Sequence, residues 1–253
     1  MHHSYIQNIS SWCLTLSLVI VFGCDQGASP PSAPPSSSPP RDGFGQRLGT
    51  DVTSQPGRSR TPPTPERPKI VAFGDSLTAG LGVSAEESYP AQLQRRLDAL
   101  GYQYRVINAG VSGDTTAGAL RRVSWVLNQT PLLVILEVGG NDGLRGLSLD
   151  QTRANLEQII QRLEQAGVRV VLAGMKLPPN YGKDYTAGFE AIYPLLAKRY
   201  RLPLIPFFLE GVATSATLNQ TDGIHPTGEG YELIVEKVLT AIRPLLSQRE
   251  GKL

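Results

Sequence analysis

The chain has 253 residues, of which 40% are hydrophobic and 18% charged, and its formal net charge is +2 at pH 7. This length fits one ordinary domain with additional segments, and the composition excludes a wholly disordered chain and a membrane protein with several spans. The nearly balanced charge lacks the basic excess of nucleic-acid-binding proteins, so we expect no nucleic-acid partner.

The few cysteine and histidine residues limit the kinds of cross-link and metal site that the chain can form. Both cysteines, Cys13 and Cys24, and two of the three histidines lie near the N-terminus, which leaves His225 as the only later histidine. This distribution excludes a disulfide framework and a Cys/His zinc site in the rest of the chain. A calcium or magnesium site made of carboxylates alone stays open.

The N-terminal segment contains an apolar run, Cys13–Phe22. As a helix it would cover about 15 Å of a hydrocarbon core about 30 Å thick, which is typical of a signal peptide and too short for a membrane span. The sequence Val21–Cys24 resembles a bacterial lipobox. We therefore expect residues 1–24 to be a signal peptide with a lipobox, and the protein to be exported to the periplasm or cell surface.

In this interpretation Cys24 is the first mature residue, and its acyl chains anchor the protein to a membrane. Phe22 stands where a small residue is usual, and the residues before the apolar run lack Lys and Arg. A signal that is cleaved without lipidation and an uncleaved apolar tail therefore stay open.

Residues 25–68 differ in composition from the rest of the chain. They hold more than half of its 20 prolines, together with many Ser, Gly and Arg residues and few large apolar ones. Such a segment buries too little surface to offset the entropy of ordering, and its prolines favour an extended spacer. We expect a disordered linker here and one folded domain over residues 69–248.

Five short apolar runs in this domain predict strands. Most lack a clean alternation of polar and apolar residues, as expected for strands covered on both faces. They are Lys69–Gly74, Tyr104–Ala109, Leu132–Val138, Arg169–Gly174 and Leu202–Phe207. Helical patterns separate the strands, so the pattern predicts an α/β fold, a three-layer α/β/α sandwich around a five-stranded parallel sheet.

The clearest helical pattern is Leu156–Leu163, in which apolar residues recur at helical spacing. Ser148 and Gln151 form an S-x-x-Q sequence that predicts a capping box at its start, and Gly167 marks its end. A last amphipathic helix is expected over residues 231–242.

Polar segments rich in glycine follow the predicted strands. They are Gly74–Leu77, Gly110–Asp114, Gly139–Asp142 and, near the C-terminus, Asp222–Pro226. In open parallel sheets the functional site lies beyond the carboxyl ends of the strands, so these segments are expected to meet at one edge.

Ser76, His225 and Asp222 have the residue types of a nucleophile, its base and the carboxylate that orients the base. Gly113 and Asn141 would stabilise an oxyanion through a backbone N–H and a side-chain amide, with the Ser76 N–H as a third donor. Taken singly, each residue has a plain structural alternative as a helix cap or a turn residue. Their joint occurrence at strand ends favours the catalytic interpretation.

These blocks, which read FGDSLTAG, NAGVSGDTT, GGNDGL and DGIHP, resemble those of the SGNH (GDSL) hydrolases. The resemblance covers the whole domain, and it implies a flavodoxin-like sheet with strand order 2-1-3-4-5. It also implies that Ser76, Gly113, Asn141 and His225 are the four family residues, with Asp222 as the acidic partner of the histidine.

The stretch Lys176–Tyr185 is similar to the substrate loop of the subgroup of bacterial thioesterase I, lysophospholipase L1 and arylesterases. That similarity gives a substrate-binding role to its apolar residues Leu177, Pro178, Pro179 and Tyr181, which would line an acyl groove. An ordinary connecting loop is the alternative.

The sequence therefore predicts a serine esterase that hydrolyses ester or thioester bonds of acyl substrates through an acyl-enzyme on Ser76, without a cofactor. Export would favour small acyl esters or lysophospholipids over cytosolic acyl-CoA. Two alternatives use the same fold: a carbohydrate O-acetylesterase, and a non-catalytic module that binds lipid or glycan.

Overall fold

The computed structural model describes residues 66–246. The predicted signal peptide, the lipobox with Cys24 and nearly all of the predicted linker lie outside these residues. In chain order the elements are β1 (Lys69–Gly74), α1 (Ser76–Ala79), η1 (Ala85–Glu87), α2 (Tyr89–Ala99), β2 (Arg105–Gly110), α3 (Thr116–Asn128), β3 (Pro131–Glu137), α4 (Gly140–Leu144), α5 (Leu149–Gln165), β4 (Arg169–Ala173), η2 (Pro179–Tyr181), α6 (Lys183–Tyr200), β5 (Leu204–Ile205), α7 (Gly228–Ile242) and η3 (Arg243–Leu245).

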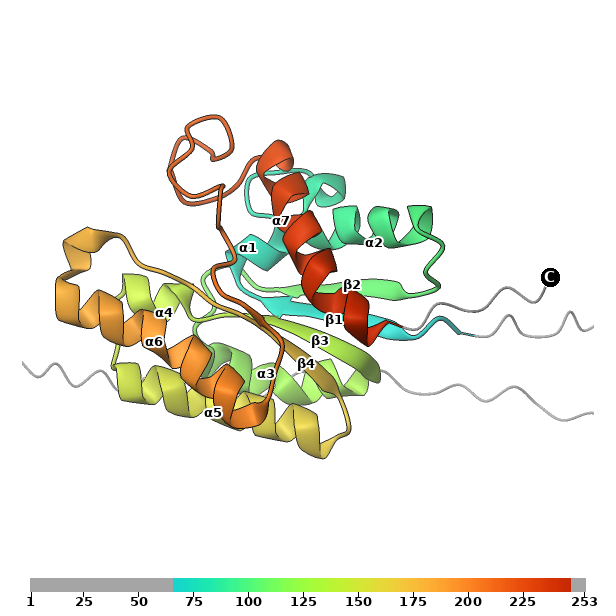
Figure 1. The fold of residues 1–253 in the computed structure, drawn as a ribbon, viewed down its shortest axis with the longest axis horizontal. Helices are drawn as coiled ribbons and strands as arrows, with labels where there is room; N and C mark the ends of the chain where they lie inside the picture. The colour runs from blue at the N-terminus through green and yellow to red at the C-terminus, as the bar shows by residue number, and fades with distance from the viewer. Residues whose placement is uncertain (1–65, 247–253) are drawn as a thin grey trace, which may run out of the picture. The chain divides into compact units, whose positions relative to one another are not determined.

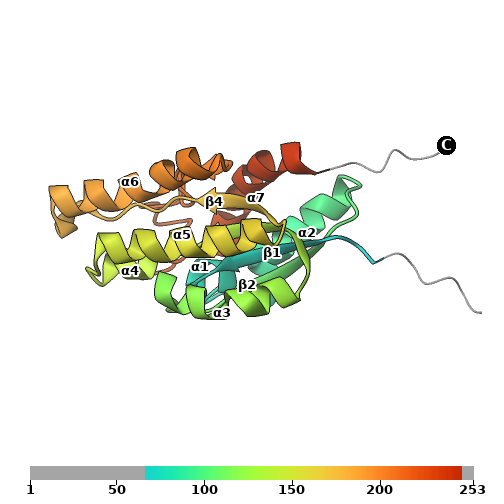
Figure 2. The same ribbon diagram turned by 90° about the horizontal axis from the view of Figure 1, so that it is seen from below.

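The five strands form one parallel sheet in the order β2-β1-β3-β4-β5. Helices α2 and α7 lie on one face of the sheet, and α3 and α5 lie on the other (Figures 1 and 2). The central strands are therefore buried on both sides, which explains their continuous apolar sequences. The predicted sandwich and its strand order are confirmed.

Strand β5 is shorter than expected. The sequence predicts Leu202–Phe207, whereas only Leu204 and Ile205 pair as a strand. Pro203 and Pro206 flank this pair, and proline has no N–H with which to extend a ladder. The edge of the sheet is therefore held by a few bonds, among them Leu172 N–H to the Pro203 carbonyl at 3.0 Å.

The predicted capping box of α5 is only half formed. The Ser148 hydroxyl accepts a hydrogen bond from the Gln151 N–H at 3.3 Å, as expected. The Gln151 side chain, however, donates to Asn155 Oδ1 at 2.9 Å instead of returning to the Ser148 backbone. The buried side chain of Asn155, one helical turn ahead, is therefore preferred as the partner of Gln151 over the exposed backbone of Ser148.

No helix within residues 66–246 is both long enough and apolar enough to cross a bilayer.

Candidate active site

The register of the sheet brings the predicted segments to one edge. Gly74 at the end of β1 is paired with Gly110 on β2 and with Glu137 on β3. The chain leaves all three strands at the same level, so the turns that follow them are neighbours.

Ser76 is the first residue of α1, directly after β1. The Asp75 side chain caps this helix by accepting a hydrogen bond from the Leu77 N–H at 3.1 Å. The helix ends after one turn because Gly80 adopts a left-handed conformation, with φ of 81°. This tight turn holds the Ser76 side chain at the sheet edge, where only 8% of the residue is exposed.

His225 lies between Ser76 and Asp222. Its Nε2 is 2.9 Å from the Ser76 Oγ, and its Nδ1 is 2.6 Å from Asp222 Oδ2. The other carboxylate oxygen, Oδ1, accepts hydrogen bonds from the backbone N–H groups of Ile224 at 2.9 Å and His225 at 3.0 Å. These backbone and side-chain hydrogen bonds lower the pKa of Asp222 to about 2. The three predicted residues thus form one continuous chain of hydrogen bonds.

The segment that carries Asp222 and His225 has little regular structure between β5 and α7. Gln220 attaches it to the rest of the protein, because its side-chain amide donates to the Leu81 carbonyl at 2.7 Å and to the Pro226 carbonyl at 3.0 Å. The Gln220 N–H also donates to the His225 carbonyl at 2.8 Å. Gln220 is therefore one of the links that hold the His225 segment at the sheet edge.

Gly113 and Asn141 lie on the β2 and β3 sides of this edge. The Asn141 amide donates to Asp75 Oδ2 at 3.1 Å, and Arg145 donates to the Gly113 carbonyl at 3.0 Å. Gly113 has φ of 79°, a conformation that favours glycine. The same Arg145 nitrogen lies 3.5 Å from the Asn141 side-chain oxygen, so one guanidinium links both segments.

Asp75 is almost fully buried beneath this arrangement. Burial raises the pKa of its carboxyl to about 6, although the hydrogen bonds from Leu77 and Asn141 act in the opposite direction. The carboxyl supports the turn and the Asn141 amide at once.

The predicted substrate loop borders the site through α4. Leu177 lies against Gly143, at which an added Cβ would come within 2.6 Å of the leucine side chain. The Tyr181 hydroxyl donates to the Leu144 carbonyl at 3.0 Å. Pro178 and Pro179 are exposed. The loop is therefore packed on the helix that carries Asn141, and its role in binding substrate stays a prediction.

Two supporting networks were not predicted from the sequence. Asp142 accepts hydrogen bonds from the Thr116 hydroxyl at 2.6 Å and from the Thr116 N–H at 2.8 Å, both inside the core. Arg122 donates to the Gly74 carbonyl at 2.8 Å and to the Ala109 carbonyl at 2.7 Å, which joins the ends of β1 and β2. Asp142 is part of the GGND sequence, whereas Arg122 is one arginine of an ordinary helix and gives no signal.

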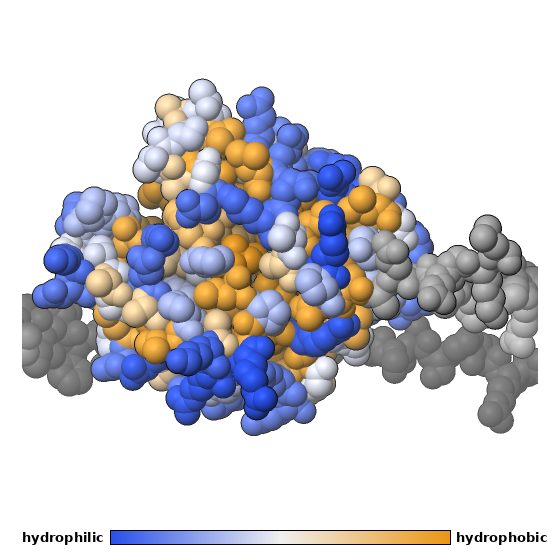
Figure 3. Space-filling model, in the orientation of Figure 1, coloured by the Kyte–Doolittle hydropathy of each residue, from blue (hydrophilic) through white to orange (hydrophobic). Residues whose placement is uncertain are grey.

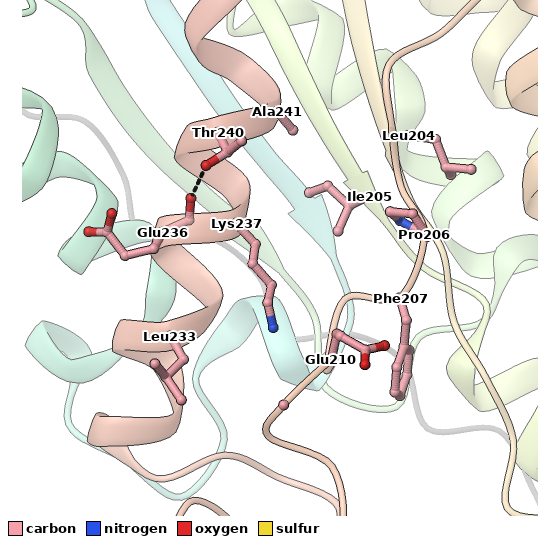
Figure 4. Close-up of a pocket in the computed structure, with 11 residues that line it drawn as sticks. Leu204, Ile205, Pro206, Phe207, Glu210, Leu233, Glu236, Lys237, Thr240 and Ala241 are labelled. Carbon is pink, nitrogen blue, oxygen red and sulfur yellow. Dashed lines mark hydrogen bonds between the residues drawn. The ribbon is translucent and has the colours of Figure 1, made fainter.

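A groove of about 800 Å³ opens elsewhere, between β5 and α7. Leu233 and Lys237 face Ile205 and Phe207 across it (Figure 4). Figure 3 shows that apolar side chains gather in the middle of this face. None of the predicted site residues lines the groove.

Within residues 66–246, no group of three or more His, Cys, Asp or Glu side chains is placed to hold a metal ion.

With this geometry established, the chain can be compared with known proteins. The model of the GDSL-like lipase/acylhydrolase family matches residues 72–233. Esterase TesA of Pseudomonas aeruginosa is 43% identical over 178 residues, which cover 70% of this chain and 89% of that protein. Thioesterase 1/protease 1/lysophospholipase L1 of Escherichia coli is 40% identical over 179 residues, or 70% of this chain and 85% of that protein.

Solved structures agree with these relatives. The crystal structure of AlinE4, an SGNH-hydrolase family esterase, is 46% identical, with a TM-score of 0.61 over 73% of this chain and 99% of that chain. A crystal structure of TesA is 42% identical and has a TM-score of 0.68, covering 70% of this chain and 99% of that chain.

Proposed function

Because this chain belongs to the GDSL-like lipase/acylhydrolase family and is a carboxylic ester hydrolase of the esterase and thioesterase type, we propose that Ser76 is its nucleophile. His225 is the general base and then the general acid, and Asp222 orients it. The observation that supports this assignment is the unbroken contact from Ser76 Oγ through both ring nitrogens of His225 to Asp222, at 2.9 Å and 2.6 Å.

The reaction proceeds in two steps. In the first, Nε2 of His225 takes the Ser76 proton while Oγ attacks the carbonyl carbon, and the imidazolium then protonates the leaving alkoxide or thiolate. In the second, His225 removes a proton from water, the hydroxide displaces the acyl group from Oγ, and the proton returns to Ser76. Asp222 stabilises the imidazolium in both steps and stays ionised, in line with its low pKa.

The oxyanion is held by three donors: the backbone N–H groups of Ser76 and Gly113 and the side-chain amide of Asn141. One Asn141 hydrogen is already directed to Asp75, which fixes the plane of the amide and leaves its second hydrogen for the substrate. Each such donor is typically worth about 10²- to 10³-fold in rate.

The substrate class follows from the relatives and from the loop after β4. Relatives are named as an esterase, an arylesterase and a thioesterase/lysophospholipase, which suits small acyl esters and lysophospholipids. Leu177 and Tyr181, packed on α4, and the exposed Pro178 and Pro179 offer an apolar border for an acyl chain.

The location of the enzyme is a separate proposal that rests on sequence alone. Residues 1–24 act as a signal with a lipobox, Cys24 carries the lipid anchor, and residues 25–68 hold the domain of residues 69–248 away from the membrane. The family match over residues 72–233 falls inside that domain. Labelling with a radioactive fatty acid tests the anchor, and its loss in C24S with retained activity is the expected result.

The catalytic proposal is tested with p-nitrophenyl esters of increasing chain length, an acyl-CoA and a lysophosphatidylcholine. Wild-type protein should hydrolyse the esters, and S76A should retain less than about 1 part in 10³ of kcat. Retention of more than a few per cent by S76A refutes the nucleophile assignment. A preference for acetylated sugars over every lipid substrate would favour an O-acetylesterase instead.

A further inference from the structure

Directly beneath the nucleophile lies an acidic side chain that the mechanism does not use. Glu137 ends β3, is completely buried and is paired across the sheet with Gly74. Its Oε2 accepts a hydrogen bond of 2.7 Å from the hydroxyl of Thr78, two residues after Ser76. The absence of a side chain at Gly74 makes room for this contact, because a Cβ there would come within 2.5 Å of Oε2.

No cation compensates this carboxyl within the described residues. None of the ion pairs among them includes Glu137, and its Oε1 has no hydrogen-bond partner there. The titratable groups that face it are acids: Asp75 after β1, Tyr89 on α2, Tyr193 on α6 and Tyr231 on α7. A buried carboxylate without a positive partner is strongly disfavoured.

Burial, and then the proximity of Asp75, raise the pKa of Glu137 well above its usual value, although hydrogen bonds from the Thr78 side chain and from the backbone of Asp75 and Thr78 act in the opposite direction. The surroundings of Glu137 therefore favour its neutral, protonated form.

The helix above it has little support of its own. Helix α1 has four residues, and three backbone hydrogen bonds close it. Ala79 donates to the Asp75 carbonyl at 2.9 Å, and Gly80 and Leu81 both donate to the Ser76 carbonyl at 3.1 Å. The Thr78 side chain is buried, and its hydrogen bond to Glu137 attaches the buried side of α1 to the central strand β3. A buried acid costs stability that an apolar residue would not, which points to a functional reason for it.

We propose that Glu137 is a positioning residue that acts in its neutral form, holding α1 through Thr78 so that the Ser76 Oγ stays within reach of His225. Neutrality matters because Asp75 lies beside it and holds Leu77 and Asn141. A second negative charge would oppose the ionisation of Asp75 and disturb the donors around the oxyanion. This inference rests on the assignment of Ser76 as nucleophile.

The test compares E137Q, E137L and T78V. Loss of the acceptor in E137L, or of the donor in T78V, should lower kcat about 10- to 100-fold, since small displacements of a nucleophile cost this much, while KM changes less than about 3-fold. E137Q keeps a neutral side chain with an acceptor for Thr78, so at least about a third of the difference in kcat between wild type and E137L should be restored in it. The inflection of its pH–rate profile should stay where it is in wild type.

T152V is the matched control for lost stability. Thr152 is also a buried threonine. Its hydroxyl donates to the Ser148 carbonyl at 3.0 Å and lies 3.4 Å from Asp142 Oδ1, and none of its hydrogen bonds within the described residues reaches α1. Melting temperatures of all variants are recorded. T78V should lose far more kcat than T152V at a comparable loss of melting temperature.

Three results would overturn the proposal. The first is a kcat of T78V within 2-fold of that of T152V, and the second is a kcat of E137Q as low as that of E137L. The third is a shift of the pH–rate inflection to lower pH in E137Q, because such a shift would mean that the substitution had removed an ionised Glu137. S76A in the same assay separates the two levels: an active S76A refutes the nucleophile itself, whereas an inactive S76A with a fully active T78V refutes only the role of Glu137.

Discussion

The replacement of Asp222 by asparagine should harm catalysis more than its replacement by alanine. The reason is the way in which its two oxygens are used. Oδ1 accepts from two backbone N–H groups, and Oδ2 faces Nδ1 of His225 at 2.6 Å. In D222N the amide oxygen must take the first position, because the reverse orientation would forfeit two hydrogen bonds worth about 1 kcal/mol each.

The asparagine NH₂ group is then directed at Nδ1. Nδ1 must accept this hydrogen bond, so the ring proton moves to Nε2, the nitrogen that has to take the proton of Ser76. A triad locked in the wrong tautomer loses about 10⁴-fold in kcat.

D222A has no such lock. It loses the attraction between carboxylate and imidazolium, about 1 kcal/mol at 4 Å in water and about 4 kcal/mol in a site of intermediate polarity. Since 45% of the Asp222 side chain is exposed, the lower half of that range applies. This corresponds to a loss of about 10- to 100-fold in kcat/KM, because 1.36 kcal/mol is one factor of ten.

The assay is kcat/KM for p-nitrophenyl butyrate from pH 6 to pH 9, with S76A as the background and melting temperature as the control for folding. We expect D222N to be about 10²-fold less active than D222A over the whole range. If D222N equals or exceeds D222A, the tautomer argument and the assigned orientation of the carboxylate are wrong.

Three further outcomes are expected. T116V deprives the buried Asp142 of its 2.6 Å hydrogen bond and should lower the free energy of unfolding in urea by about 1–3 kcal/mol; an unchanged midpoint contradicts this. An alanine Cβ at Gly113 would meet no atom closer than 3.6 Å, and alanine keeps the backbone N–H. G113A should therefore lower the free energy of unfolding by the cost of a left-handed alanine, about 1–2 kcal/mol, and lower kcat by less than about 10-fold. A loss of about 10²-fold or more would contradict this expectation and mean that the turn no longer directs its N–H at the oxyanion. The pKa of Asp75 is raised to about 6 in the folded state, so the folded protein retains a proton that the unfolded chain releases. The free energy of unfolding of the wild type should therefore fall by up to about 3 kcal/mol as pH rises from about 4 to about 6. Urea titrations at pH 4 and pH 7 should find a larger loss in wild type than in D75N, in which the raised pKa of Glu137 still contributes a loss of the same sign.

The sequence predicted the elements whose signals are local. The strands themselves, the turn after β1 and the sequence that carries His225 are each visible within about ten residues, whereas the order of the strands was implied by the family resemblance. The roles of Arg122 and Glu137 were not predicted, because their partners lie on elements far away in the sequence, and an acid inside an apolar run gives no sign of what it contacts. The short β5 is a different case, since Pro203 and Pro206 are local signals whose effect on the edge strand was underestimated.

The hydrogen bonds of Gln220 also affect the temperature at which the enzyme loses activity. The Ser76 hydroxyl follows directly after β1, a strand that is paired on both sides. The imidazole is instead carried by the irregular residues 220–225, most of which are exposed and which polar links, among them those of Gln220, attach to the rest of the domain. Segments of this kind detach at lower free-energy cost than a central sheet. Heating should therefore abolish activity at a temperature at which the sheet is still folded. Substitutions at Gln220, or around the Leu81 and Pro226 carbonyls to which it donates, should shift that temperature.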